Sequence, residues 1–319
     1  MTYTVVIAIM LSFGISVVLG PVVIPFLRKL KFGQTVREDG PETHLKKNGT
    51  PTMGGVMILT AIVITSLIFM KEYPQIIPVL CLTLGFGLVG FLDDYIKVVL
   101  KRSMGLRAWQ KMALQLLITG AFAFYVNNYL AVDLAMKIPF VQGKYIDFGW
   151  FNIPLLFIVV IGTDTGANFT DGLDGLATSV TTMIATFFAV IAIGQNSGIA
   201  PITGAVIGAL LGFLVYNTNP AKVFMGDTGA LALGGFVAAS AYVLQMPLFL
   251  LIVGLIYVVE VLSVIIQVTY FKLTHGKRFF KMAPIHHHFE KCGWEETRIV
   301  TVFTIITALL CLVALLGAW

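Results

Sequence analysis

The residues of this chain best suited to chemistry are carboxylates in short polar segments between long apolar runs. Asp93 and Asp94 are adjacent at the end of one such run, in the string Gly90-Phe-Leu-Asp-Asp-Tyr-Ile-Lys97. Adjacent carboxylates repel each other unless a cation offsets their charge, and carboxylates at the edge of an apolar run are costly unless they face a polar cavity. The pair therefore indicates a cation site or a polar cavity; a solvated helix end with Lys97 as partner is the alternative.

A second acidic segment, Asn168-Phe-Thr-Asp171-Gly-Leu-Asp174, has two carboxylates three residues apart. If the segment is helical, Asp171 and Asp174 lie on one face, and the glycine between them allows a ligand to approach the backbone. The segment therefore indicates a binding site, with a polar turn between two helices as the alternative.

A third segment, from Asn217 to Asp227, ends in a single carboxylate beside glycine at the start of the next apolar run. Such a carboxylate suits Mg²⁺, which takes one or two carboxylates and completes its shell with phosphate oxygens and water. Asp227 is therefore a candidate Mg²⁺ ligand. Phe224 either anchors the segment in a membrane or stacks on a planar ring.

Three consecutive histidines, His286, His287 and His288, form the least ordinary string of the chain. They cannot all face one metal ion from a regular helix, so contacts to phosphate or another ligand fit better than a mononuclear zinc site. The alternative is a surface loop with incidental histidines.

Basic, hydroxyl and glycine residues, among them Lys47 and Thr52, precede the apolar run that starts near residue 53. An anion site at a helix start is the functional interpretation. An acidic metal centre beside such phosphate-binding groups is what phosphoryl transfer requires, because catalysis there is mostly positioning and charge neutralisation.

The apolar runs that must position these residues dominate the chain: 58% of its 319 residues are hydrophobic and 12% are charged, and the mean hydropathy is +0.92. A membrane-spanning helix needs about 20 mostly apolar residues. We predict an all-α polytopic membrane protein with a single domain over 1–319, because no polar gap is long enough for a soluble domain. The predicted transmembrane helices, about ten, lie near 3–27, 53–70, 75–92, 112–130, 152–167, 175–194, 199–216, 229–245, 247–271 and 299–318.

Charge is distributed asymmetrically between the gaps. Alternate gaps hold all five His and every Lys and Arg except Lys71, Lys137 and Lys144. Because basic loops remain in the cytoplasm, we predict that the gaps that hold these basic residues face the cytoplasm. Both termini then lie outside it, and the active site is on the cytoplasmic face. The net charge of +5 reflects this orientation and would attract anionic substrates. The sequence has no compact basic domain of the kind that would indicate nucleic-acid binding. One substrate can then be a lipid phosphate and the other a soluble nucleotide conjugate.

The polar strings also resemble, along essentially the whole chain and in the same order, those of a known family. It is the bacterial phospho-N-acetylmuramoyl-pentapeptide-transferase family of the polyprenyl-phosphate N-acetylhexosamine-1-phosphate transferase superfamily. The strings are Thr50-Pro-Thr-Met-Gly-Gly55, Phe91-Leu-Asp-Asp-Tyr95, Asn168-Phe-Thr-Asp-Gly-Leu-Asp-Gly175, Val223-Phe-Met-Gly-Asp227 and Met282-Ala-Pro-Ile-His-His-His-Phe289.

The resemblance implies a ten-helix enzyme of the bacterial cytoplasmic (inner) membrane. Its reaction moves phospho-MurNAc-pentapeptide from UDP-MurNAc-pentapeptide to undecaprenyl phosphate, giving lipid I and UMP, with Mg²⁺. The resemblance does not fix whether the chain forms a homodimer. The implied roles are Asp227 as the metal ligand; Asp93, Asp94, His286, His287 and His288 as catalytic residues; Lys97 near phosphate; and Lys47, Thr52, Asn168, Asp171, Asp174, Asn217 and Phe224 in the nucleotide pocket. Glu260 also fits the family pattern, in a run expected to be broken or bent.

One segment departs from the family. Where the family has Thr-x-Asn-Ala-Val-Asn, this chain has Thr163-Asp-Thr-Gly-Ala-Asn168. Thr165 thus replaces an Asn and Asp164 adds a carboxylate, so no role is carried over to either position. The rivals to this function are a sister transferase that uses UDP-GlcNAc and a transporter. Transporters, however, place their sites near the membrane midplane rather than in the gaps of one face.

Overall fold

The protein is described by a computed structural model that covers residues 1–319 except 31–48, 103, 130–133 and 319. Lys47 therefore lies outside the described residues. The long helices coincide with the ten predicted runs. They are α1 (Thr2–Leu30), α3 (Gly55–Phe69), α4 (Ile76–Val98), α5 (Ala108–Tyr129), α6 (Asn152–Thr170), α7 (Leu176–Gly194), α8 (Ala200–Asn217), α9 (Gly226–Val243), α11 (Leu255–Leu273) and α13 (Glu296–Ala318).

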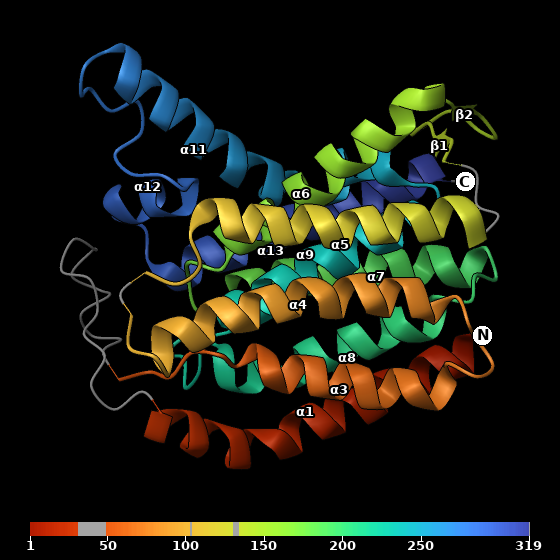
Figure 1. Ribbon diagram of the computed structural model, residues 1–319, viewed down its shortest axis with the longest axis horizontal. Helices are drawn as coiled ribbons and strands as arrows, with labels where there is room; N and C mark the ends of the chain where they lie inside the picture. The colour runs from red at the N-terminus through yellow and green to blue at the C-terminus, as the bar shows by residue number, and fades with distance from the viewer. Residues whose placement is uncertain (31–48, 103, 130–133, 319) are drawn as a thin grey trace.

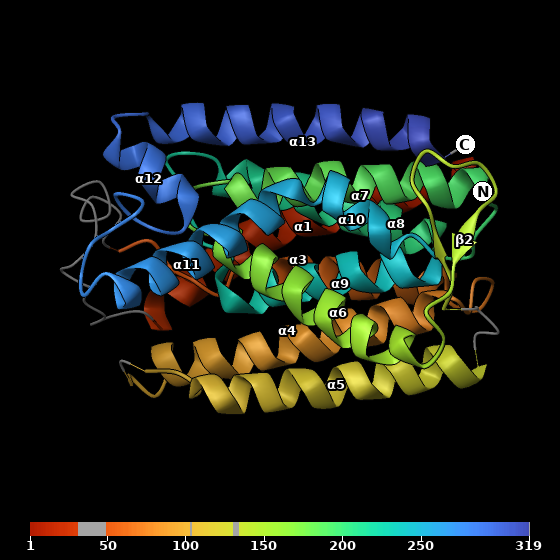
Figure 2. The ribbon, with the colours of Figure 1, turned by 90° about the horizontal axis from the view of Figure 1, so that it is seen from above.

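The helices lie side by side with their long axes roughly aligned, and α13 and α5 lie at opposite edges of the bundle (Figure 2). Within the described part of the chain, seven helical segments are long and apolar enough to cross a membrane, and α3 is apolar but shorter. The protein is therefore an all-α, multi-pass membrane protein by composition and architecture. The two termini lie at the same end of the bundle (Figure 1).

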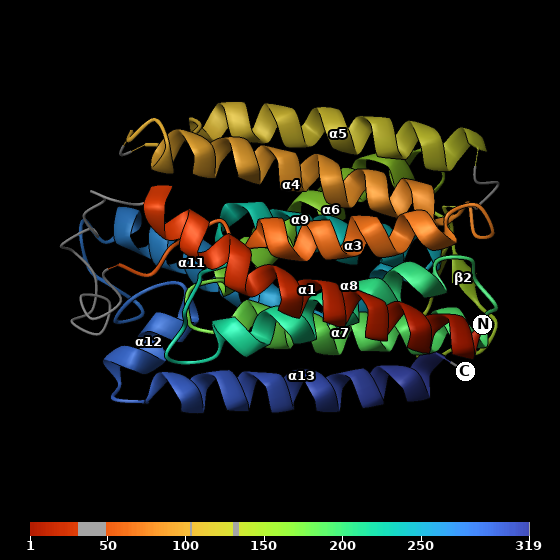
Figure 3. The ribbon, with the colours of Figure 1, turned by 90° about the horizontal axis from the view of Figure 1, so that it is seen from below.

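Helix α9 is the centre of the bundle. Every residue from Thr228 to Val243 is buried, and α9 packs against α3, α4, α6 and α7. Helix α8 is similarly enclosed by α1, α3 and α7 (Figure 3). A helix that is apolar on all sides must be covered on all sides, and this explains why α9, which carries Asp227 at its start, lies in the middle of the bundle.

The ninth apolar run is broken, as the resemblance implied. It consists of a 3-10 turn (Pro247–Phe249), the four-residue helix α10 (Leu250–Val253) and then α11, with Gly254 between them. Helix α11 leans away from the rest of the bundle toward α12 (Ile285–Lys291) (Figure 1). A two-stranded antiparallel hairpin, β1 (Met136–Lys137) with β2 (Tyr145–Ile146), lies between α5 and α6 in the chain.

The α4–α9 contact depends on Gly90. A Cβ atom at this position would lie 2.1 Å from the carbonyl oxygen of Asp227, and backbone cannot yield as a flexible side chain can. We expect Gly90→Ala to lower the free energy of unfolding by about 2 kcal/mol, a typical cost of overpacking, measured as thermal denaturation in detergent. Gly14→Ala is the matched control, because a Cβ there meets no atom within 4 Å. Equal melting temperatures for the two variants would contradict this packing argument.

Candidate active site

The two adjacent carboxylates of α4 have different partners. Asp93 accepts a hydrogen bond from the Leu106 backbone N–H at 2.6 Å and forms an ion pair with Lys97, one turn further along α4. Asp94 accepts bonds from the Thr228 N–H at 2.9 Å and hydroxyl at 2.6 Å, and from the Asp227 N–H at 3.3 Å. Because the first N–H groups of a helix have no partner within it, Asp94 caps the start of α9.

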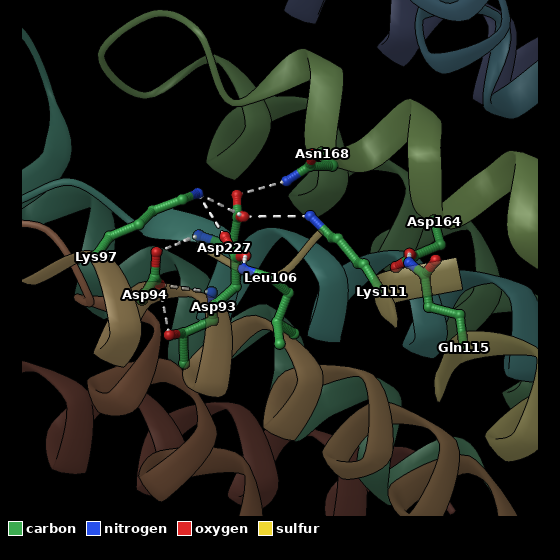
Figure 4. A network of polar contacts seen from close by, with 10 residues as sticks. Asp93, Asp94, Lys97, Leu106, Lys111, Gln115, Asp164, Asn168 and Asp227 are labelled. Atoms are coloured by element: carbon green, nitrogen blue, oxygen red, sulfur yellow. Dashed lines mark hydrogen bonds and ion pairs between the residues drawn. The ribbon is translucent and has the colours of Figure 1, made fainter. Parts of the chain in front are cut away.

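Asp227 is the point at which four helices meet (Figure 4). Its Oδ2 atom accepts from the ammonium groups of Lys97 of α4 at 3.2 Å and Lys111 of α5 at 3.1 Å. Its Oδ1 atom accepts from Asn168 Nδ2 of α6 at 2.9 Å. The side chain is thus aimed into a polar centre formed by α4, α5, α6 and α9.

The same centre fits a divalent cation. Carboxylate oxygens of Asp93, Asp94 and Asp227 all lie within 4.8 Å of one another, and carboxylate oxygen is the ligand type that Mg²⁺ prefers. The sequence indicated a cation site or a polar cavity at Asp93 and Asp94 and a metal ligand at Asp227; the structure brings the three carboxylates together as candidate ligands of one ion. Lys97 and Lys111 offset part of the negative charge that three close carboxylates create.

The segment that contains Asp171 and Asp174 forms a turn between α6 and α7. Asp171 is half-buried, and its pKa is raised well above the ordinary range by burial and by the nearby carboxylates Asp227 and Asp94. Asp174 Oδ2 accepts from the Ala221 N–H at 3.0 Å and from Asn219 Nδ2 at 3.2 Å. Asp171 therefore borders the carboxylate centre, whereas Asp174 shapes the loop before α9.

Asn217, Phe224 and Thr52 position the same loop. Asn217 accepts from the Thr178 hydroxyl at 2.7 Å and donates to the Val223 carbonyl at 3.0 Å. The backbone of Phe224 pairs with the segment before α3, donating to Pro51 O and accepting from Gly54 N, each at 2.8 Å. This pairing brings the Thr52 hydroxyl, like the Asp94 carboxylate, against Gly226 at the start of α9 and leaves Phe224 partly exposed.

The three histidines lie on α12 and make three different contacts. His286, 1% exposed, hydrogen-bonds through Nδ1 to Glu260 Oε1 of α11 at 3.0 Å. Its Nε2 atom faces Gly172, where a Cβ would lie 2.1 Å from it, and has no hydrogen-bond partner among the described residues. His287 hydrogen-bonds to Glu290 at 2.6 Å, and His288 accepts from the Lys281 N–H at 3.1 Å. Only His286 is thus placed against the Asp171–Asp174 turn.

Two side chains at the centre were not anticipated from the sequence. In the sequence, Lys111 is only one of the basic residues that mark a cytoplasmic gap, and the buried Gln115 was not noted. The sequence pattern that could have revealed them is a lysine and a glutamine four residues apart at the start of an apolar run, since this spacing puts both on one face of α5. Asp164 hydrogen-bonds with Gln115 and is fully buried, whereas the Thr165 hydroxyl only donates to the Ile161 carbonyl of its own helix.

Comparison with known proteins decides the family. Residues 76–245 match the model of glycosyl transferase family 4, and residues 47–59 match signature 1 of phospho-N-acetylmuramoyl-pentapeptide-transferase. Curated proteins of that name are similar over nearly their whole length. The chain belongs to the phospho-N-acetylmuramoyl-pentapeptide-transferase family.

Three curated relatives of that name match nearly the whole chain. The protein from Caldicellulosiruptor bescii is 51% identical, with 97% of this chain and 96% of the relative covered. One from Clostridium botulinum is 52% identical (98% and 96%) and one from Clostridium kluyveri is 49% identical (99% and 99%). Membership of the phospho-N-acetylmuramoyl-pentapeptide-transferase family makes the centre at Asp93, Asp94 and Asp227 a candidate site of phosphoryl transfer.

Proposed function

We propose that this chain transfers phospho-MurNAc-pentapeptide from UDP-MurNAc-pentapeptide to undecaprenyl phosphate, giving lipid I and UMP for peptidoglycan synthesis. The observation that carries the proposal is the meeting of Asp93, Asp94 and Asp227 with Lys97 and Lys111 at one end of an apolar bundle. Carboxylates that could hold a cation, beside ammonium groups that could bind phosphate, match what a pyrophosphate and a lipid phosphate require. Family membership supports the choice of substrates.

The proposal includes the membrane arrangement. Ten crossings, with both termini outside the cytoplasm, would put the site at the cytoplasmic face of the bacterial inner membrane, where UDP-sugars are available. The basic gaps support this orientation by the positive-inside rule. The position of both termini at one end of the bundle (Figure 1) supports an even number of crossings.

In the proposed reaction, an oxygen of the lipid phosphate attacks the β-phosphorus of the UDP-sugar, and the bond to the UMP oxygen breaks. Lys97 and Lys111 would neutralise the phosphate oxygens, and Asp93 would orient the acceptor. Asp227, with Asp93 and Asp94, would hold Mg²⁺, which supplies charge neutralisation on the pyrophosphate when bound. A phosphate monoester with a second pKa near 6 is largely dianionic at pH 7, so little general-base catalysis is needed.

In the alternative two-step route, an Asp first attacks the UDP-sugar and forms a phosphoryl-enzyme with release of UMP. This route can be distinguished by isotope exchange. Labelled UMP should then exchange into the UDP-sugar without lipid acceptor. The ion pair of Asp93 with Lys97 favours the single displacement, because a carboxylate held by an ammonium group is a weaker nucleophile.

The direct test uses the purified chain in detergent with undecaprenyl phosphate, Mg²⁺ and either UDP-MurNAc-pentapeptide or UDP-GlcNAc. We expect UMP release that requires the lipid acceptor and is at least about 100-fold faster with the pentapeptide substrate, since a site that contacts the extra groups of a substrate discriminates strongly against analogues that lack them. Equal release from the two substrates would favour the sister GlcNAc-1-phosphate transferase. Absence of UMP release from either would exclude the proposed activity.

A further inference from the structure

The segment that joins α11 to α12, with the last turn of α11, carries a basic cluster that the proposed mechanism does not use. The chain has no Asp or Glu between Glu260 and Glu290. Within the described part of the chain, no basic side chain of the cluster forms an ion pair with a carboxylate, so the positive charge is available to an anion from outside the protein. The members of the basic cluster, all exposed, are Lys272, Lys277, Arg278 and Lys281.

Large apolar side chains are exposed among these basic residues. Leu273 is 74% exposed, Phe279 60% and Phe271 45%. Apolar side chains in water cost hydrophobic free energy, whereas at the boundary of a bilayer they reach the acyl chains while lysine and arginine reach the headgroups. The combination of a basic cluster with exposed apolar residues is therefore typical of a surface that contacts lipid.

Specific contacts fold the segment back against the end of α11. The Phe280 N–H donates to Gln267 Oε1 of α11 at 2.8 Å. The Phe279 ring packs edge-on against the Tyr270 ring of α11, with 5.6 Å between the ring centroids. The basic cluster and its apolar neighbours therefore form one folded surface rather than an extended loop.

The position of α11 puts this surface beside the membrane. Helix α11 leans away from the other helices, and its last turn lies at the same end of the bundle as α12 but off to the side (Figure 1). Only 22% of the apolar window of α11 is buried inside the protein, so most of this helix must contact acyl chains. Basic residues directly after such a helix lie at the level of the headgroups, and they attract those that are anionic.

We propose that the basic cluster, together with Phe271, Leu273 and Phe279, binds the headgroups of anionic phospholipids. Because α11 is surrounded by acyl chains, a phospholipid reaches the cluster from the side, whereas a soluble anion offers the exposed apolar residues no partner. The inference goes beyond the proposed function and rests on it only for the choice of leaflet, which under the proposed membrane arrangement is the cytoplasmic one.

The experiment is native mass spectrometry of the full chain in neutral detergent, titrated with dioleoylphosphatidylglycerol or dioleoylphosphatidylcholine, without substrates. The double variant Lys277→Gln/Arg278→Gln removes two charges of the basic cluster. It leaves Lys281, whose ammonium group donates to the Lys291 carbonyl of α12 at 3.1 Å. We expect the dissociation constant of the first phosphatidylglycerol to rise about 10-fold or more, since each basic side chain near an anionic surface contributes about 5-fold in affinity. The dissociation constant of phosphatidylcholine should not change.

The control, Lys71→Gln/Lys144→Gln, makes the same charge change at two exposed positions outside the basic cluster. It should bind phosphatidylglycerol as the wild type does, and both double variants should melt within about 2 °C of the wild type, as for exposed substitutions. Equal losses of affinity in the two double variants, or no loss in either, would overturn the inference.

A competition arm distinguishes a lipid from a soluble anion. Glycerol phosphate carries a phosphate group without acyl chains, and at a concentration equal to that of phosphatidylglycerol it should not displace the lipid. Displacement would assign the basic cluster to a soluble anion and overturn the inference. Since no substrate is present, a chain that binds phosphatidylglycerol but in the separate assay releases no UMP would count against the proposed function alone.

Discussion

Replacement of Asp227 with asparagine should reduce UMP release from UDP-MurNAc-pentapeptide by about 1000-fold, the upper range for loss of one preorganised electrostatic group. Asp227 is the common partner of Lys97, Lys111 and Asn168 and one of three carboxylates close enough to share a metal ion. An amide cannot replace the charge that organises both lysines, so the loss should appear in kcat more than in KM.

The control for this variant is Asp147→Asn, which makes the same chemical change in the segment that follows β2. Among the described residues, Asp147 accepts side-chain hydrogen bonds only from nearby positions in the chain, the Gly149 N–H at 2.8 Å and Asn152 Nδ2 at 2.6 Å. Its activity should remain within about 2-fold of the wild type, as for a substitution away from the site. If Asp227→Asn retained a tenth of wild-type turnover, Asp227 would not be the centre of the site.

Replacement of Glu260 with leucine should destabilise the protein by about 3 kcal/mol, because the buried groups that hydrogen-bond to this carboxylate would lose their partner. Both carboxylate oxygens are used: Oε1 by His286 Nδ1 and Oε2 by the Ile285 N–H, each at 3.0 Å. Leucine would leave a ring nitrogen and the first N–H of α12 buried without partners. The measurements are thermal denaturation and kcat/KM of the folded fraction.

Two variants make the Glu260 result specific. Glu260→Gln keeps an acceptor for the Ile285 N–H and should recover most of the stability while His286 loses its carboxylate partner. Ser263→Ala, on the same face of α11, removes a buried hydroxyl that bonds only to the Glu260 carbonyl, and should cost less than about 1 kcal/mol. Equal stability of Glu260→Leu and Ser263→Ala would show that the pair does not hold α12 to α11.

Much of the helical architecture was predictable because long apolar runs have few alternatives in a membrane. The ten runs became helices, and polar strings such as Asp171–Asp174 fell in the turns between them. Family resemblance implied that the ninth run is broken or bent, but the position of the break, at Gly254, is known only from the structure.

What the sequence could not give were the contacts between helices. Lys111 counted only as a basic residue of a cytoplasmic gap and Gln115 only as part of the apolar run near 112–130, because nothing local shows that α5 faces Asp227 and Asp164. Three adjacent histidines looked equivalent, yet the helical rotation of α12 sends only His286 toward Gly172. The rotation of each helix about its axis and the identity of the helices beside it are set by tertiary packing. These two properties determine which side chains reach the active site.

The cap that Asp94 forms on α9 gives the two neighbouring aspartates different evolutionary constraints. Asp93 is tied to a lysine and to the backbone of the loop after α4, so a change there alters chemistry without touching the central helix. Asp94 fastens the first turn of that helix through three hydrogen bonds. A lineage could therefore drift at Asp93 and still insert a well-folded, inactive protein, whereas drift at Asp94 would also reduce the amount of protein that survives quality control in the membrane.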